Sequence, residues 1–268
     1  MKFFIIILIL YNVGMVVTKN KKWKIHLPNK IKVFNLGSSH GYFAFNYNEI
    51  NGGGNLAYES QTFYYDFKML MNFWENIEKD AVCFLPISYF SFSNRKYSLI
   101  EDKNKYFKIL KFSLIDKEDK IEAFIMRYLP LIYSIVKRIK KLKKKKEKKG
   151  EERIKVHVKI CKNSDERTSL LYLEQLLEKL KEKNIRIILI TTPFRKYYND
   201  FFTNELLNEK FYKYIYQIKN KYNLEYYDFS HSYEIFEKEE YFNDYDHLNE
   251  KGSKIFMKEI EKILKRGK

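Results

Sequence analysis

Residues 31–40 read Ile31-Lys-Val-Phe-Asn-Leu36-Gly37-Ser38-Ser39-His40, an apolar run that ends in small and polar residues. An apolar run of this length, closed by turn residues, is typical of a buried strand. In an α/β protein, a serine that follows such a strand and enters a helix is exposed at the edge of the sheet, where nucleophiles lie. Ser39 is therefore the candidate nucleophile.

Apolar strand-like runs alternate with helical segments along much of the chain. We expect strands at 31–36, 81–87, 185–190 and 224–228, and helices at 61–78, 164–180, 204–221 and 253–265. Buried strands flanked by helices predict a three-layer α/β/α sandwich with a central, mainly parallel sheet of flavodoxin-like type. Gly52 to Gly54 are interpreted as a flexible turn, because no Gly-Lys-Ser phosphate loop follows them.

A second chemical motif lies near the other end of the chain, at Asp244-Tyr-Asp246-His247. A histidine with a carboxylate three residues before it can supply a general base and the group that orients it. His40 and His231 are rival bases, and Asp228 is a reserve carboxylate, but none of them stands in this pattern.

The two end motifs resemble those of the SGNH (GDSL-type) hydrolases. Gly37-Ser38-Ser39 is similar to the family's Gly-Asp-Ser block, and Asp244 to His247 matches its Asp-x-x-His block. The resemblance implies that Ser39 is the nucleophile, His247 the base and Asp244 its orienting carboxylate.

The resemblance also covers part of the oxyanion machinery. The segment beginning Asn55-Leu-Ala57 is similar to the family's Asn-x-Gly-x-Ser block, with Ala57 in place of the glycine whose amide helps to bind the oxyanion. The family's Gly-x-Asn-Asp block is missing, and its expected place reads Ser88-Tyr89. Asn55, Ala57 and Ser88 are the oxyanion or substrate-binding candidates, with Tyr89 as a substitute.

Within this superfamily, the chain most resembles membrane-anchored bacterial envelope proteins of teichoic-acid D-alanylation and exopolysaccharide O-acetylation. Some of these carry Gly-Ser-Ser after an N-terminal apolar segment. The resemblance implies an acyl-ester hydrolase or acyltransferase acting on an acylated glycan or glycolipid, with a membrane acyltransferase as a potential partner. A secreted esterase for small or lipid esters and a non-catalytic envelope scaffold remain alternatives.

The composition narrows the range of partners. The net charge of +17 is compatible with an anionic partner, but the chain is rich in Lys, Ile, Asn, Tyr and Phe, as AT-rich bacterial genomes produce. Nucleic acid is not expected, because no aromatic and basic binding module is present. Nothing has metal-ligand spacing, so we expect neither a metal nor another cofactor. Cys83 and Cys161 neither require nor exclude a disulfide.

The N-terminal residues 1–22 are interpreted as a signal peptide or an uncleaved membrane anchor, because an apolar run follows Lys2. This predicts a membrane-anchored or exported protein of the cell envelope. The lysines after the run favour a cytoplasmic location for the residues that follow, which conflicts with export, but lysine is common throughout the chain. Residues 23–268 are the expected hydrolase-like domain, with a mostly helical insertion at about 95–160. The insertion contains the basic run 137–149, a solvated face or a contact for anionic lipid or polymer.

Overall fold

A computed structural model describes residues 14, 27–93, 103–141, 150–163 and 166–266, without the side chains of 136–141. These residues form two compact units, one of residues 27–93 and 150–266 and one of residues 103–141. We call them the sheet unit and the helical unit. The segment expected as a signal peptide or anchor lies outside the described residues, apart from Gly14. In the part of the chain described, no helix is both long and apolar enough to cross a membrane.

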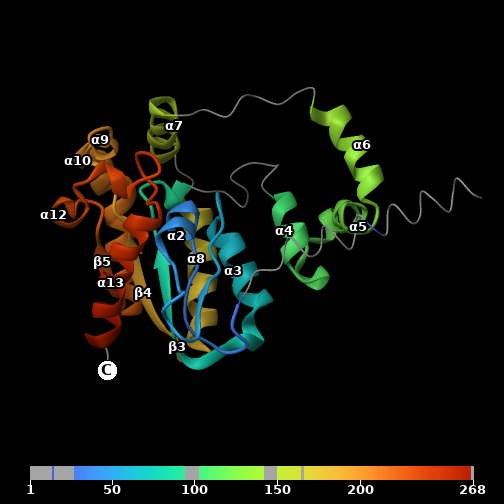
Figure 1. Cartoon of the computed structure of the whole chain (residues 1–268), viewed down its shortest axis with the longest axis horizontal. Coiled ribbons are helices and arrows are strands. Elements are labelled where there is room, and N and C mark those ends of the chain that lie inside the picture. Colours follow the sequence, from blue (N-terminus) through green and yellow to red (C-terminus); the bar gives the residue numbers. More distant parts are fainter. Residues whose placement is uncertain (1–13, 15–26, 94–102, 142–149, 164–165, 267–268) are drawn as a thin grey trace, which may run out of the picture. The chain divides into compact units, whose positions relative to one another are not determined.

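A parallel sheet forms the centre of the sheet unit (Figure 1). Its strands have the order β2-β1-β3-β4-β5, and every neighbouring pair is parallel. Their bounds are β1 Ile31–Asn35, β2 Gly53–Asn55, β3 Ile77–Pro86, β4 Arg186–Thr191 and β5 Glu225–Asp228. The predicted α/β sandwich with a mainly parallel sheet is therefore confirmed.

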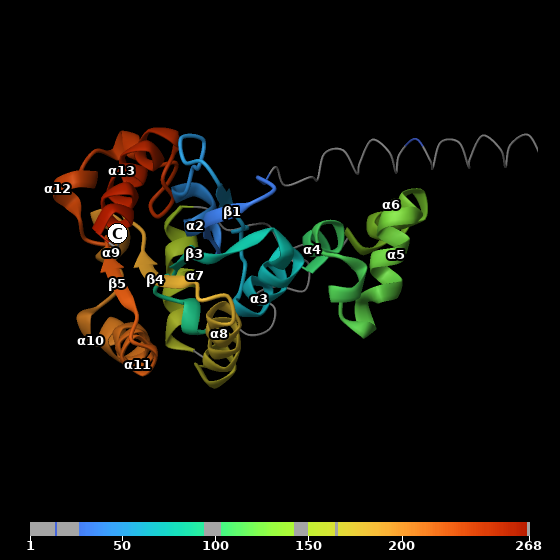
Figure 2. The same cartoon turned by 90° about the horizontal axis from the view of Figure 1, so that it is seen from below.

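Helices cover both faces of this sheet (Figure 2). On one face lie α2 (Ser39–Ala44) and α13 (Glu250–Arg266), whose Phe256 and Ile260 pack with Phe84 and Ile188 of the sheet. On the other lie α8 (Glu166–Lys181) and α11 (Lys213–Tyr222), and α8 packs against α3 (Phe63–Asn72). Apolar strands need such cover on both faces, which explains their nearly continuous hydrophobic sequence.

The remaining helices of the sheet unit are short or lie near the sheet edge. They are η1 Trp74–Asn76, η2 Ser91–Ser93, α7 Glu151–Lys162, α9 Lys196–Asn199, α10 Asn204–Leu207, η6 Asn208–Tyr212, α12 Tyr233–Phe236 and η7 Glu239–Tyr241. The helix predicted over 61–78 ends at Asn72, and β3 already begins at Ile77. The helix predicted over 204–221 is α10 and α11 with a π-helical segment between them.

The prediction of a flexible turn for Gly52 to Gly54 is wrong for the last two glycines. Gly52, with φ of +76°, lies in a turn, but Gly53–Asn55 is strand β2, paired with β1 through Val33. A Cβ on Gly53 would lie 2.5 Å from the ring of Tyr47, so close packing requires a glycine in this strand.

The helical unit contains α4 (Lys103–Ile109), η4 (Phe112–Leu114), η5 (Lys117–Asp119), α5 (Lys120–Tyr128) and α6 (Pro130–Lys141). Within the insertion, expected to be mostly helical, α5 and α6 are separate helices, because Pro130 lacks an N–H donor and begins the second one. Helix α7 lies within the range predicted as an insertion but belongs to the sheet unit.

Candidate active site

Ser39 lies where the order of the strands reverses. The chain enters the sheet at β1, and its neighbours β2 and β3 lie on opposite sides of that strand. The carboxyl ends of strands at such a switch point form the usual ligand site of an open α/β sheet. Gly37 makes the turn out of β1 with φ of +100°, and a Cβ there would meet Pro86 of β3 at 3.1 Å. Ser39 is then the first residue of α2.

The structure brings the three predicted triad residues together. His247 Nε2 lies 2.8 Å from Ser39 Oγ, and His247 Nδ1 lies 2.9 Å from Asp244 Oδ2. Both distances are those of good hydrogen bonds. The candidate nucleophile, base and orienting carboxylate are thus joined in one chain of hydrogen bonds, across more than two hundred residues of sequence.

Hydrogen bonds to backbone groups within the loop fix the positions of Asp244 and His247. Asp244 Oδ1 accepts hydrogen bonds from the amides of Asp246 at 3.1 Å and His247 at 3.0 Å. The amide of Asn243 donates to the carbonyl of His247 at 2.8 Å, and Phe242 bridges Leu248 in antiparallel fashion. The three-residue spacing of Asp-x-x-His follows from this turn, since one carboxylate oxygen binds the amides and the other the imidazole.

Arg153 of α7 also reaches this site, which sequence reasoning missed. Its Nη2 lies 3.0 Å from Asp244 Oδ1 and also pairs with Asp246 Oδ1, while its Nη1 lies 3.2 Å from His247 Nδ1. A carboxylate can only accept, so the short contact from Asp244 assigns the proton to His247 Nδ1 and leaves Nε2 free to accept from Ser39. Arg153 therefore acts on His247 through its charge and through Asp244.

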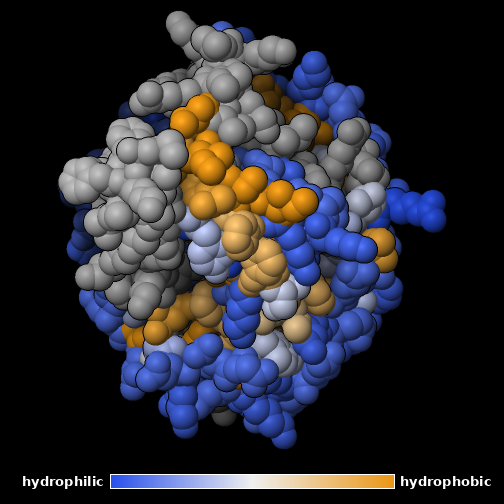
Figure 3. Space-filling model, turned by 90° about the vertical axis from the view of Figure 1, so that its right-hand side faces the viewer, coloured by the Kyte–Doolittle hydropathy of each residue, from blue (hydrophilic) through white to orange (hydrophobic). Residues whose placement is uncertain are grey.

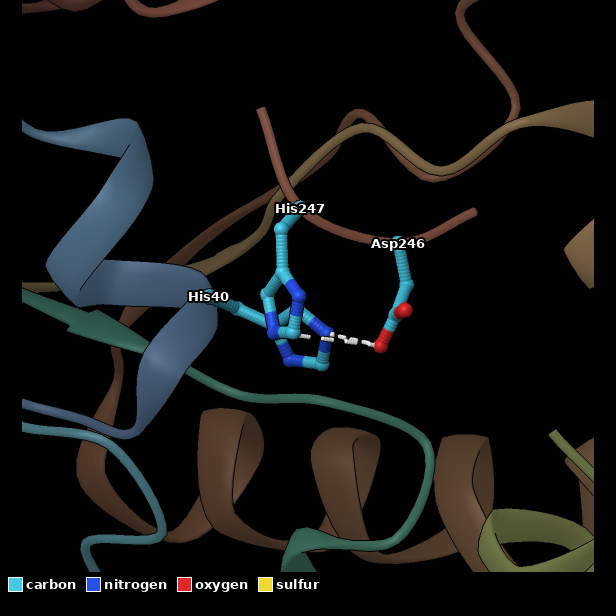
Figure 4. A group of neighbouring side chains, drawn as sticks. All are labelled: His40, Asp246 and His247. Atoms are coloured by element: carbon cyan, nitrogen blue, oxygen red, sulfur yellow. Dashed lines mark hydrogen bonds and ion pairs between the residues drawn. The ribbon is translucent and has the colours of Figure 1, made fainter. Parts of the chain in front are cut away.

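Asp246 forms a second network directly beside the first. Its side chain is fully buried, and its Oδ2 accepts from His40 Nε2 at 2.9 Å (Figure 4). Its Oδ1 binds Arg153. His157 Nδ1 lies 3.7 Å from the same carboxylate. Burial raises the pKa of Asp246, but the hydrogen bond from His40 and the attraction of the surrounding imidazoles outweigh burial and lower the pKa below its usual value.

The two histidines near Asp246, His40 and His157, have lowered pKa values. Burial lowers the pKa of His40, and burial lowers the pKa of His157 to about 4. Both rings are thus neutral near pH 7. His157 Nδ1 also lies 3.1 Å from the hydroxyl of Tyr198. His40 Nε2 is occupied by Asp246, so the histidine that contacts Ser39 is His247 and not the rival His40.

The oxyanion candidates are already engaged in other hydrogen bonds. The amide of Ala57 donates to Asn55 Oδ1 at 3.0 Å, and Asn55 Nδ2 donates to the carbonyls of Tyr42 and Phe45 at the end of α2. The amide of Ser88 donates to Ser91 Oγ at 2.9 Å within its own turn. Their oxyanion role stays a prediction, which requires the Ala57 amide to exchange its partner on substrate binding.

The other candidate site residues, Asp228, His231 and Tyr89, form hydrogen bonds with other partners. Asp228 accepts from the amide and hydroxyl of Ser230 and from Tyr212, and His231 Nδ1 lies 2.9 Å from Ser230 Oγ. Tyr89 donates its hydroxyl to Asn199. These bonds explain the residues as local structure around β5 and its loops.

A buried acid, Asp66 of α3, supports the turn that presents Ser39. Its Oδ1 accepts from the amide of Gly37 and from Gln61 Nε2, each at 2.7 Å. Burial raises the pKa of Asp66 to about 7, although both hydrogen bonds act against the rise. An acid inside an aromatic helix gives no sequence signal for this long-range role.

His40, Asp246 and His247 together resemble a metal-ligand set, since their ligand atoms lie within 4.8 Å of one another. Each of them already has a partner, because His247 Nε2 faces Ser39 and Asp246 binds both His40 and Arg153. These hydrogen bonds account for the cluster as part of the serine site, and the expectation of a metal-free protein stays a prediction.

Comparisons with known proteins add little on function. No family model matches the chain, and no curated protein matches it. A Bacteroides fragilis structure named as a candidate acylhydrolase is 12% identical, with a TM-score of 0.44, covering 93% of this chain and 94% of the other. A GDSL-like lipase structure from Bacteroides thetaiotaomicron is 10% identical, with a TM-score of 0.42, covering 95% and 98%.

A third similar structure, from Bacillus subtilis, is 11% identical with a TM-score of 0.46. The match covers 90% of this chain but 58% of that longer one. At such identities and scores, the activity has to be judged from the site itself.

Proposed function

We propose that the protein is a serine-dependent acyl-ester hydrolase or acyltransferase with a Ser39–His247–Asp244 triad. The observation that carries this proposal is the unbroken hydrogen-bond chain from Ser39 Oγ through the His247 imidazole to Asp244. A serine hydroxyl is a poor nucleophile until a neighbouring base accepts its proton, and this geometry supplies that base.

In the proposed reaction, His247 Nε2 takes the Ser39 proton as Oγ attacks the acyl carbonyl carbon. The resulting tetrahedral oxyanion is stabilised by backbone amides, for which Ser39 and Ala57 are the candidates. As the C–O bond to the leaving alcohol breaks, His247 returns the proton to that alcohol. Water, or a second hydroxyl group, then attacks the acyl-Ser39 ester in the same way and regenerates the serine.

We further propose an acylated envelope glycan or glycolipid as the substrate and the cell envelope as the location. Support comes from the resemblance at Gly37-Ser38-Ser39 and from the apolar residues that follow Lys2. Transfer to a second hydroxyl group would involve a membrane acyltransferase partner, whereas hydrolysis needs none.

A second candidate, a non-catalytic scaffold, is favoured by one observation. The Ala57 amide is occupied by Asn55, and the Gly-x-Asn-Asp block is missing from the sequence. Without an oxyanion site the triad would lose a large part of its rate advantage.

The test is acid release from p-nitrophenyl acetate, butyrate and octanoate and from an O-acetylated polysaccharide, with the full chain. We expect Ser39→Ala to abolish turnover and the neighbouring Ser38→Ala to retain it, because the Ser38 side chain caps no helix amide. Fast hydrolysis of the small esters alone would favour the secreted-esterase alternative. A folded wild-type protein that turns over none of them would favour the scaffold.

A further inference from the structure

The helical unit exposes a row of large apolar side chains along α5 and α6. Half of the ten exposed large hydrophobic side chains in the described residues fall between 121 and 135. They are Ile121 (75% exposed), Phe124 (49%), Tyr128 (47%), Ile132 (50%) and Ile135 (55%). We call these five residues the apolar stripe. Single exposed hydrophobic residues are ordinary, but three on α5 and two on α6 within fifteen residues of sequence mark an interaction surface.

The stripe is a second apolar face of α5, and not the face that holds the unit together. On the other side of α5, Ala123 and Met126 are buried, and Arg127 donates to the carbonyls of Phe107 and Leu110 near the end of α4. Within the stripe, residues 121, 124 and 128 recur at helical spacing. The packing of α5 on α4 therefore leaves the α5 part of the stripe facing solvent, and Ile132 and Ile135 of α6 are exposed as well.

The sequence that follows the stripe is basic. After Ile135 the sequence runs through residues 137–149 with ten Lys or Arg and one Glu. Figure 3 shows hydrophobic side chains gathered into a patch on a face where hydrophilic side chains border them. An apolar stripe of Ile and Phe beside a lysine-rich segment is the pattern of a helix that lies in the plane of an anionic bilayer surface.

We infer that α5 and α6 bind the headgroup region of an anionic membrane, with the apolar stripe turned towards the lipids. The stripe supplies apolar surface that lipid removes from water, and the lysines supply attraction for phosphate headgroups. A protein partner with an apolar groove would not account for the accompanying excess of positive charge. The inference goes beyond the acyl chemistry, because lipid contact needs no reactive Ser39.

The test uses the full chain with one introduced cysteine that carries an environment-sensitive nitrobenzoxadiazole dye. Phe124→Cys and Ile132→Cys place the dye in the stripe, and Leu171→Cys on α8 is the matched control, since Leu171 is 53% exposed. Cys83 and Cys161 are fully buried, so the dye attaches at the introduced position. Vesicles of phosphatidylcholine alone are compared with equal parts of phosphatidylcholine and phosphatidylglycerol.

We expect a blue shift and a several-fold rise in emission at positions 124 and 132 with the anionic vesicles, reduced by high salt, and little change at position 171. Equal responses at all three positions, or none at 124 and 132, would overturn the inference. Emission that is already blue-shifted without vesicles would overturn it too. Such emission would show that another segment of the chain covers the stripe or, if the shift depends on protein concentration, that a second copy of the chain covers it.

A second measurement separates this inference from the proposed function. In vesicle sedimentation, Ile121→Ser with Ile132→Ser should bind the anionic vesicles several-fold more weakly than Leu171→Ser. Ser39→Ala should bind them as wild type does. Lipid binding by an inactive protein would thus uphold the membrane contact alone, and activity without stripe-dependent binding would uphold the acyl chemistry alone.

Discussion

Arg153 and His247 lie side by side, with Nη1 of the guanidinium 3.2 Å from Nδ1 of the imidazole. The same guanidinium pairs with Asp244 and with the buried Asp246. One cation from α7 thus fixes both carboxylates of the Asp244–His247 loop and lies beside the proposed base.

Replacing Arg153 should slow the reaction. In Arg153→Gln the ion pairs of the guanidinium with Asp244 and Asp246 are lost, so α7 no longer holds the loop that carries Asp244 and His247. We expect kcat/KM of Arg153→Gln to fall by roughly tenfold, which corresponds to about 1.4 kcal/mol. Arg153→Lys keeps the charge and should lose clearly less. The measurement is kcat/KM of ester hydrolysis for the three proteins, with circular dichroism to show that each is folded. Wild-type kcat/KM in folded Arg153→Gln would contradict a positioning role for Arg153.

The raised pKa of Asp66 predicts that the free energy of unfolding depends on pH. Its pKa is raised to about 7, above the ordinary value of 3.8, so the folded protein holds a proton there that the unfolded chain releases. Its contribution is therefore fully present below about pH 4 and is lost as pH rises towards 7, with a slope of at most about 1.4 kcal/mol per pH unit.

Asp66→Asn resembles the protonated acid and should remove this dependence. The difference in unfolding free energy between Asp66→Asn and wild type should therefore grow in favour of the variant from pH 4 to pH 7, as measured by urea denaturation. A difference that is constant with pH would show that Asp66 does not titrate in this range.

Asn55 should matter for stability through the end of α2. Its side-chain amide donates to the carbonyls of Tyr42 and Phe45, and its oxygen accepts from Ala57. We expect Asn55→Ala to lower the free energy of unfolding by about 1–3 kcal/mol, because these groups lose their partner. Asn46→Ala, which removes one exposed bond to the Asn48 amide, serves as the control and should cost clearly less. Equal losses in chemical denaturation would contradict this assignment.

Chelation should leave the reaction unchanged. The cluster of His40, Asp246 and His247 is explained by hydrogen bonds to Ser39 and Arg153, and the proposed steps use protein groups alone. Dialysis against EDTA is therefore expected to preserve ester turnover within experimental error. Loss of turnover that added zinc restores would assign a metal to this cluster.

The proximity of Ser39, His247 and Asp244 was predictable from sequence because much of their geometry is encoded locally. Ser39 follows an apolar strand through a glycine turn, and the spacing of Asp244 and His247 is set by a turn in which the carboxylate binds the next amides. The alternation of strands and helices likewise predicts the parallel sheet. Strand β2 escaped prediction, because Gly53 is required by packing against Tyr47, which no local pattern reveals.

Arg153 and Asp66 could not be found in the same way. Arg153 stands in a segment crowded with lysines, where one more cation is not distinctive, and it meets His247 only through the tertiary placement of α7. Asp66 reaches Gly37 across 29 residues. Both act through contacts that depend on how the elements pack, and residue spacing does not determine that packing.

The most direct test of the central claim is covalent labelling by a fluorophosphonate probe, which reacts with an activated serine. We predict that the full chain is labelled and that Ser39→Ala and His247→Ala each abolish labelling. Ser38→Ala and His231→Ala should retain it, and circular dichroism should show that all five proteins are folded. Labelling that persists in Ser39→Ala, or its absence from folded wild-type protein, would contradict the assignment of Ser39 as an activated nucleophile.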